Sequence, residues 1–294
     1  MPDKHTPSQS IVTTAHSGAA DATLRPMYMG DLHKVLDIIN AHDDDDAEAA
    51  EADFHESGFE GQFVLEKDDK VIGVTGYRPV PATDNTYWLS WTYLHKAFRG
   101  QGLGKKMTSE LIDKLCTQGG RKLFVKVSTY EDPEQGQIYA RALKMYQSIG
   151  FELEVTSHDF YDIGEDQLIL GLILRDKGDA TFEDDIEVQD EKPVIRFNGL
   201  QEISETEGSY TFLWEVKDTV KLFGKRSFSS DDLIIGLRAV KSDDGRKIFL
   251  TFPSNLPLIH KPLQTTGFKY VGQLTNYYEA GVHEMHFTHD LEGL

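Results

Sequence analysis

Cysteine, basic side chains and long apolar runs are scarce in this sequence. Cys116 is the only cysteine among 294 residues, so no disulfide can form within the chain, and we expect a reducing compartment. Lysine and arginine total 30 against 49 aspartates and glutamates, which gives a formal net charge of −19. This charge repels polyanions, so we expect neither a nucleic-acid partner nor an anionic membrane surface as partner. Residues 1–20 lack the apolar core of a signal peptide, and we expect a cytoplasmic protein.

The remaining composition is that of a folded protein. Hydrophobic residues make up 39% of the chain and aromatic residues 11%, enough for packed cores in one large domain or two modest ones. Residues 1–20 are rich in small and polar residues and are expected to form a disordered tail. Residues 179–192 are dominated by acids and are expected to form a linker. The histidines do not show the spacing of a zinc site, so we expect no metal.

A glycine-containing turn dominates the organisation of the first half. The segment from Leu94 to Lys105 follows an apolar, aromatic run and leads directly into a helical pattern. The first N–H groups of a helix have no intrahelical partner and carry the positive end of the helix dipole, and glycines allow a phosphate to approach the backbone. Arg99 and Lys105 add positive charge beside them. A Gly-x-Gly string alone is a weak signal, so its context decides its meaning.

The helix expected after this turn has one apolar stripe. Leu103, Met107, Leu111 and Leu115 recur at i+4 spacing. Cys116 falls beside this stripe and is expected in the core. Thr108 belongs to the opposite face, which is expected to be exposed.

Two blocks in this order resemble the GCN5-related N-acetyltransferase (GNAT) family. Arg99, Gly102 and Gly104 match the acyl-CoA loop pattern Arg/Gln-x-x-Gly-x-Gly/Ala of that family. The run from Ala142 to Phe151 is similar to the family's A-x-x-x-Y-x-x-x-G-F block, with Tyr146 at the tyrosine. Two blocks in the right order are a much stronger signal than either one alone.

This resemblance implies a fold and a chemistry. The fold class is α/β (α+β): a GNAT fold over residues 21–178, with a mixed, mostly antiparallel sheet flanked by helices. The reaction would be acetyl transfer from acetyl-CoA to a primary amine, with Tyr146 as the general acid for the departing thiolate. The backbone near Leu94 would polarise the thioester carbonyl. The residues assigned to acetyl-CoA are Leu94, Arg99, Gly100, Gln101, Gly102, Leu103, Gly104 and Lys105.

The sequence leaves the general base open. Many relatives use a glutamate on the strand before the loop, yet residues 87–94 contain no carboxylate. His158, Asp159 and Asp162 follow the tyrosine helix, but such loop residues are more often merely exposed. We assign no base, and loss of the amine proton through water remains open. Tyr146 itself has an alternative interpretation as an aromatic core residue.

The acceptor is suggested only by charge. In the family, the segment between the first strand and the hairpin commonly lines the acceptor site, and here residues 43–56 are dominated by acids. We hypothesise a cationic acceptor, either a small molecule or a lysine side chain, while noting that charge runs are usually only solvated. The competing function is a non-catalytic acyl-CoA sensor or an interaction protein that kept the fold. Oligomeric state and acyl chain length are not predicted.

An internal repeat extends the argument to the end of the chain. Gly150-Phe151 aligns without gaps on Gly267-Phe268, and Gly164 on Gly281. The run Arg121-Lys122-Leu123-Phe124 recurs as Arg246-Lys247-Ile248-Phe249. A repeat of this length indicates a duplicated fold unit. Residues 193–294 therefore suggest a shortened, degenerate GNAT-like domain, without a Gly-x-Gly turn before its helix and without a tyrosine four residues before Gly267.

Overall fold

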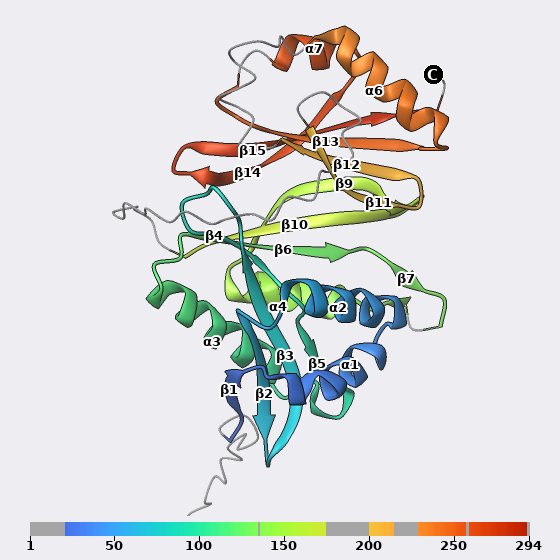
Figure 1. Cartoon of the computed structure of the whole chain (residues 1–294). Coiled ribbons are helices and arrows are strands. Elements are labelled where there is room, and N and C mark those ends of the chain that lie inside the picture. The colour runs from blue at the N-terminus through green and yellow to red at the C-terminus, as the bar shows by residue number, and fades with distance from the viewer. Residues whose placement is uncertain (1–20, 135, 175–199, 215–228, 257–258, 293–294) are drawn as a thin grey trace, which may run out of the picture. The chain divides into compact units, whose positions relative to one another are not determined.

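The computed structural model describes residues 21–134, 136–174, 200–214, 229–256 and 259–292 (Figure 1). The chain forms two compact units, one of residues 1–74 with 93–107 and the other of residues 75–92 with 108–294. Strand β3 (Lys70–Pro79) and helix α3 (Leu103–Thr117) each run from one unit into the other. The expected tail, residues 1–20, and the expected linker, residues 179–192, lie outside the described residues.

Unit one contains a small sheet and two helices. Its elements are β1 (Thr23–Pro26), η1 (Met29–Asp31), α1 (Leu32–Asn40), α2 (Asp44–Ser57), β2 (Gln62–Lys67), the start of β3, β5 (Tyr93–Leu94), η2 (Lys96–Phe98) and the first turn of α3. The strand order is β1-β2-β3, and β5 pairs with β3. Val35, Ile38 and Ile39 of α1 are buried, since they repeat at the helical period.

Helix α2 was not expected, because the acidic run seemed to offer only solvated side chains. Its buried positions are Ala47, Ala50 and Phe54, which recur at i, i+3 and i+7 on one face. Two of these three are alanines, so the apolar signal is weak beside so many acids. The acids themselves favour this helix: Asp43 is its N-cap, and three aspartates occupy the first turn, next to the positive end of the dipole.

Unit two begins with an amino-terminal lobe, residues 75–92 and 108–174. Its elements are the rest of β3, β4 (Thr86–Leu89), the rest of α3, β6 (Lys122–Ser128), the short pair β7 (Glu131–Asp132) and β8 (Gly136–Gln137), α4 (Ala140–Ile149), β9 (Glu152–Asp162) and β10 (Glu165–Ile173). The strand order is β3-β4-β6-β10-β9, in which β4 and β6 run parallel and the other pairs antiparallel. Leu115 of α3 and Tyr146 of α4 pack with Leu123 and Val125 of β6 in one core.

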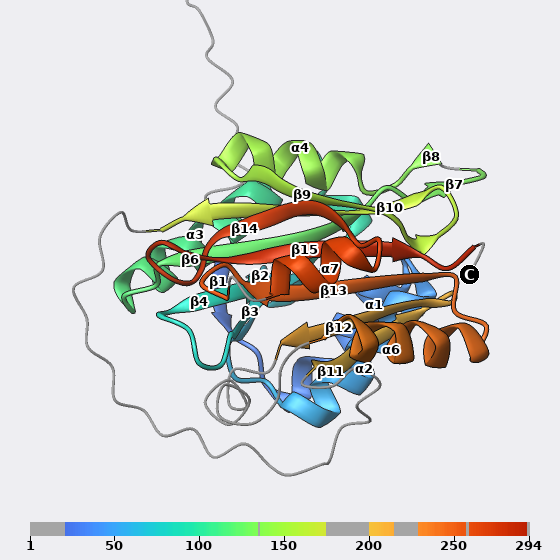
Figure 2. The ribbon, with the colours of Figure 1, turned by 90° about the horizontal axis from the view of Figure 1, so that it is seen from above.

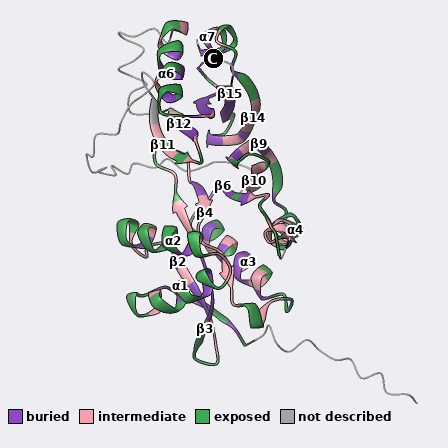
Figure 3. Cartoon of the chain, turned by 90° about the vertical axis from the view of Figure 1, so that its right-hand side faces the viewer, coloured by how far each residue is buried: buried purple, intermediate pink, exposed green. Residues whose placement is uncertain are grey.

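The carboxy-terminal lobe, residues 200–292, repeats this arrangement. Its elements are β11 (Leu200–Thr206), β12 (Ser209–Trp214), α6 (Ser230–Ser242), β13 (Lys247–Pro253), α7 (His260–Thr265), β14 (Lys269–Glu279) and β15 (Val282–Asp290). The strand order is β11-β12-β13-β15-β14, and the one parallel pair is again the second with the third, β12 with β13. Helices α6 and α7 lie on one face of this sheet (Figures 1 and 2), and every residue of β13, in the middle of the sheet, is buried, whereas β14 at its edge is mostly not (Figure 3).

Two expectations for α3 were wrong. Cys116 is exposed, because it lies one residue beyond Leu115 and is rotated by about 100° off the buried stripe. Thr108 is fully buried instead of exposed, so the buried side of α3 is wider in its first half than the i+4 stripe alone. Its hydroxyl has no hydrogen-bond partner among the described residues.

Candidate active site

The predicted phosphate loop lies in unit one and has the backbone conformation that requires glycine. After β5, the short helix η2 ends at Phe98, and α3 begins at Leu103. Gly100 and Gly102 between them have φ angles of +77° and +76°, a region that L side chains rarely adopt. A Cβ atom built on either glycine would meet nothing within 4 Å. Glycine is therefore required here by the backbone angle alone, and the backbone faces open space that a ligand could enter.

The start of α3 is electrostatically suited to an anion. Its first turn contains no acidic residue, while Lys105 and Lys106 lie within it. The Lys106 ammonium donates to the carbonyl of Ala22 at 2.6 Å, whereas Lys105 is exposed. The positive end of the dipole and the lysine charge therefore add at this terminus. Gln101 is also exposed, and Leu103 is buried beneath the turn.

The side chain of Arg99 contacts Leu94 and His42. We had expected it to be available to bind a phosphate, so these contacts within the protein differ from that expectation. The Nε of Arg99 donates to the Leu94 carbonyl oxygen at 3.0 Å. One terminal nitrogen lies 3.4 Å from Nδ1 of His42. The guanidinium therefore fixes the end of β5 to the loop that follows it, and β5 is in turn paired with β3 through Gly73 and Val74.

A cluster around Tyr93 was missed from the sequence. The Tyr93 hydroxyl donates to a carboxylate oxygen of Asp46, and its ring packs edge-on against His42 at 5.4 Å between centroids. Burial, and then the nearby charge of Arg99, hold the pKa of His42 below its usual value. His42 thus favours the neutral form next to the loop. The residues are separated by about fifty positions in the chain, and nothing in the spacing of one segment signals their contact.

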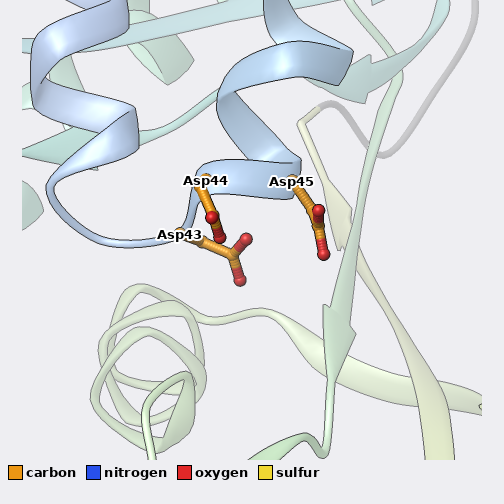
Figure 4. Close-up of side chains that lie close together, drawn as sticks. All are labelled: Asp43, Asp44 and Asp45. Atoms are coloured by element: carbon orange, nitrogen blue, oxygen red, sulfur yellow. The ribbon is translucent and has the colours of Figure 1, made fainter.

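The acidic residues at the start of α2 form a local group (Figure 4). Asp43 accepts the backbone N–H of Asp46 at 3.2 Å and so caps the helix. Carboxylate oxygens of Asp43, Asp44 and Asp45 lie within 4.8 Å of one another, a spacing that could hold a metal ion. Asp44 and Asp45 are exposed, and helix capping with dipole stabilisation is sufficient to explain all three.

Tyr146 lies on α4 in unit two and points into the core. Its side chain is 4% exposed, and its ring packs edge-on against Phe151 at 5.5 Å. Its hydroxyl hydrogen-bonds the side chain of Thr92, whose hydroxyl lies 3.0 Å from that of Thr75. Burial raises the pKa of Tyr146 to about 12, so its phenol is protonated at neutral pH. Tyr146 can donate a proton, and it also packs as a core aromatic.

The alternative bases have structural partners. His158 lies 2.8 Å from a carboxylate oxygen of Asp166. Asp159 has a φ of +52° and accepts the backbone N–H of Gly164 at 2.8 Å, which, as the largest favourable contact, lowers the pKa of Asp159. Asp162 accepts from the neighbouring backbone at the same turn. These contacts belong to the hairpin turn between β9 and β10, and none of them identifies one of the three residues as the general base.

A protein-family model and several solved structures match part of this chain. The model of the acetyltransferase (GNAT) family matches residues 29–151. A candidate GNAT acetyltransferase from Desulfovibrio desulfuricans is 25% identical, with a TM-score of 0.46, and the match covers 52% of this chain and 99% of that one. A candidate acetyltransferase from Salmonella typhimurium with its cofactor acetyl-CoA is 20% identical, with a TM-score of 0.44, over 54% and 98% of the two chains.

A third solved structure, a ribosomal-protein-S18-alanine N-acetyltransferase from Escherichia coli, is 20% identical, with a TM-score of 0.43, over 55% of this chain and 99% of that one. None of the curated proteins matches the sequence. The chain thus contains a GNAT acetyltransferase domain over residues 29–151 and has the GNAT fold, an α/β arrangement with a mixed sheet flanked by helices. No helix in the described ranges is long and apolar enough to cross a membrane.

Proposed function

We propose that this protein transfers the acetyl group of acetyl-CoA to a primary amine. The observation that carries the proposal is the loop from Arg99 to Lys105, which joins two glycines of positive φ to a helix start without acids, inside the segment that matches the GNAT family. Main-chain N–H groups of the loop would hold the pyrophosphate. The loop residues themselves are Arg99, Gly100, Gln101, Gly102, Leu103, Gly104 and Lys105.

In the proposed reaction, the neutral amine attacks the thioester carbonyl, which a backbone N–H near Leu94 polarises. A carbon–nitrogen bond forms and the carbon–sulfur bond breaks. The departing thiolate takes a proton from the Tyr146 hydroxyl, and the amine loses its own proton to water. Protonation of Tyr146 at neutral pH is consistent with this role. The protein would act in the cytoplasm on an acceptor that we take to be cationic.

The experiment is ligand stabilisation. Acetyl-CoA should raise the unfolding temperature of the whole chain, and the stabilisation should grow with the logarithm of one plus the ratio of its concentration to the Kd. Gly102→Val should abolish this rise, because the side chain both opposes the φ of +76° and blocks the backbone approach of a phosphate. Gly104→Val should weaken it. The matched control is Gly164→Val, which meets a φ of +84° in a hairpin turn of unit two and should lower stability while keeping the acetyl-CoA shift.

A non-catalytic acyl-CoA sensor is the second candidate function. It is favoured by the absence of a carboxylate from β4 and by the depth at which Tyr146 is buried. Release of free CoA thiol over a panel of amines separates the two functions. Stabilisation without turnover of any amine would favour the sensor, whereas an unchanged shift in Gly102→Val would contradict both.

We further propose that the carboxy-terminal lobe is a degenerate second copy that binds no CoA. Helix α6 corresponds to α3, but Ser229 accepts the N–H of Asp232 at 3.2 Å and Asp232 returns the contact to Ser229. This capping box occupies the helix start, and Asp231 adds a second negative charge there. Calorimetry should give one acetyl-CoA per chain. A stoichiometry of two would refute this assignment.

A further inference from the structure

The two lobes of unit two hold each other through a pair of arginines. Arg121, the residue before β6, donates from its terminal nitrogens to the carbonyl oxygens of Asn276 at 2.5 Å and Tyr277 at 3.2 Å. Arg246, the residue before β13, donates to the carbonyl oxygens of Asp159 at 2.6 Å and Phe160 at 3.5 Å. Each arginine therefore reaches into the other lobe and contacts two consecutive carbonyl groups there.

The carbonyl groups that receive these contacts occupy equivalent turns. Asp159 and Asn276 are related by the sequence repeat, and both have positive φ angles, +52° and +57°. Each side-chain oxygen Oδ1 accepts the N–H of the glycine five residues on, Gly164 at 2.8 Å and Gly281 at 2.9 Å. Each arginine also makes an equivalent contact within its own lobe. Nε of Arg121 donates to the carbonyl of Asp84, and Nε of Arg246 donates to the carbonyl of Glu207.

Further contacts repeat in the same reciprocal way. The Thr86 hydroxyl donates to the Tyr277 carbonyl at 2.6 Å, and the Ser209 hydroxyl donates to the Phe160 carbonyl at 2.5 Å. Thr86 and Ser209 begin corresponding strands, β4 and β12. The aromatic contacts follow the same pattern: Phe124 lies 5.5 Å from Tyr277 between ring centroids, and Phe249 lies 5.0 Å from Phe160.

Reciprocity of this kind defines an isologous interface, in which residue i contacts residue j of the partner and j contacts i. Such an interface has a two-fold axis, and a residue near the axis must meet its own counterpart. The repeat relates Val155 to Gly272. A Cβ atom built on Gly272 would lie 3.2 Å from Cγ2 of Val155, so these two positions do meet. A lobe recruited only to cover apolar surface would have no reason to match the other side contact for contact.

We propose that the carboxy-terminal lobe occupies, within one chain, the place of the second subunit in an isologous dimer of the amino-terminal lobe. The surface that each lobe presents to the other is thus equivalent in the two lobes, and Arg121 and Arg246 are the equivalent arginines that connect them. This inference rests on the proposed relation between the lobes and not on the acetyl-transfer reaction. It explains why a lobe with a capped helix start still keeps the arginine, the hydroxyl and the aromatic residue of the contact.

Hydrogen exchange on the intact chain tests the reciprocity. Arg121→Ala removes the arginine donor from the carbonyls of Asn276 and Tyr277, of which Tyr277 keeps the Thr86 hydroxyl. Arg246→Ala does the same at Asp159 and Phe160, of which Phe160 keeps the Ser209 hydroxyl. Each 1.4 kcal/mol lost corresponds to a factor of ten in the opening equilibrium. Arg121→Ala should accelerate amide exchange in residues 276–279 by about tenfold or more, and Arg246→Ala should do the same in residues 159–162. Arg238→Ala, an exposed arginine on α6, should change neither segment. Arg121→Gln and Arg246→Gln serve the same purpose if an alanine variant fails to fold.

The second test replaces a residue of one lobe by the residue at the equivalent position of the other lobe. Ser209 is 1% exposed, and a methyl group added at a buried, unrelated position usually overpacks the core. Because Thr86 already fits the equivalent position, Ser209→Thr should be tolerated with little change in unfolding temperature, whereas Ser209→Ala should lower it. The proposal would be overturned if only one of the two arginine variants accelerated hydrogen exchange in the opposite lobe. It would also be overturned if Ser209→Thr were strongly destabilised. Acetyl-CoA binding measured on the same variants reports separately on the proposed reaction.

Discussion

Tyr146 combines two roles that a single substitution can separate. Tyr146→Phe keeps the ring that packs against Phe151 but removes the hydroxyl that contacts Thr92. Loss of a general acid typically lowers the rate by about a hundredfold, so kcat should fall by about that factor while the apparent affinity for acetyl-CoA stays nearly constant. Tyr87→Phe is the matched control, because Tyr87 is a buried tyrosine of the same core. Full activity in Tyr146→Phe would leave Tyr146 with its packing role only.

The same hydroxyl should make the protein sensitive to alkali. Burial raises the pKa of Tyr146 from 10.0 to about 12, so the fold favours the neutral phenol. This contribution to the free energy of unfolding is fully present below pH 10.0 and is lost as the pH rises toward 12. Denaturant unfolding at a series of pH values should therefore show a smaller decline in this window for Tyr146→Phe than for the parent chain. Parallel declines would contradict the assignment.

Single positions were predicted well where the backbone dictates the residue and poorly where contacts are distant. The sequence predicted a glycine-containing turn between a strand and a helix, and Gly100 and Gly102 lie in such a turn, although their positive φ angles were not predicted. The contact of Tyr93 with Asp46 joins positions 47 residues apart and has no local signal. Cys116 was misplaced because a stripe drawn at i+4 spacing does not fix which neighbouring residue is buried at the end of a helix.

The starts of helices α3 and α6 differ more clearly than the strand orders of the two lobes do. The strand orders of the two lobes are matched, which supports the proposal of a duplicated unit drawn from the sequence repeat. Helix α2, by contrast, was hidden because its buried face is mostly alanine. The start of α6 depends on Ser229, whose side chain caps the helix, whereas no acid lies in the first turn of α3. A helix start can bind an external anion only when its own side chains leave it available.

Removal of this cap should therefore lower stability without creating a binding site. Ser229→Ala leaves an N–H of the first turn unpaired and should cost about 1 kcal/mol in the free energy of unfolding. Ser230→Ala, one position inside the helix, should cost less because Ser230 does not cap. Denaturant unfolding measures both variants, and calorimetry should still give a single acetyl-CoA site. A second site in Ser229→Ala would show that only the cap blocks the helix.

The net charge of −19 bears on which acceptor the whole molecule attracts. Acids at the start of α2 either draw a cationic acceptor toward unit one or serve only the helix. Electrostatic attraction is screened by salt over about 10 Å at 0.1 M. If the acids recruit the acceptor, the KM for a polyamine probe such as spermidine should rise several-fold as ionic strength increases, while the KM for an uncharged amine stays constant.

Substitution can locate this effect without disturbing the cap. Asp44 and Asp45 are exposed, whereas Asp43 caps α2 and Asp46 accepts from Tyr93. Asp44→Asn with Asp45→Asn should raise the KM for spermidine several-fold and weaken its salt dependence, with acetyl-CoA affinity unchanged. The matched control is Asp68→Asn with Asp69→Asn, which removes the same charge from the β2–β3 turn, where the φ angles of +50° and +59° suit asparagine equally well. Equal effects of the two pairs would assign the attraction to net charge, and no effect of the first pair would leave α2 as an acidic surface helix.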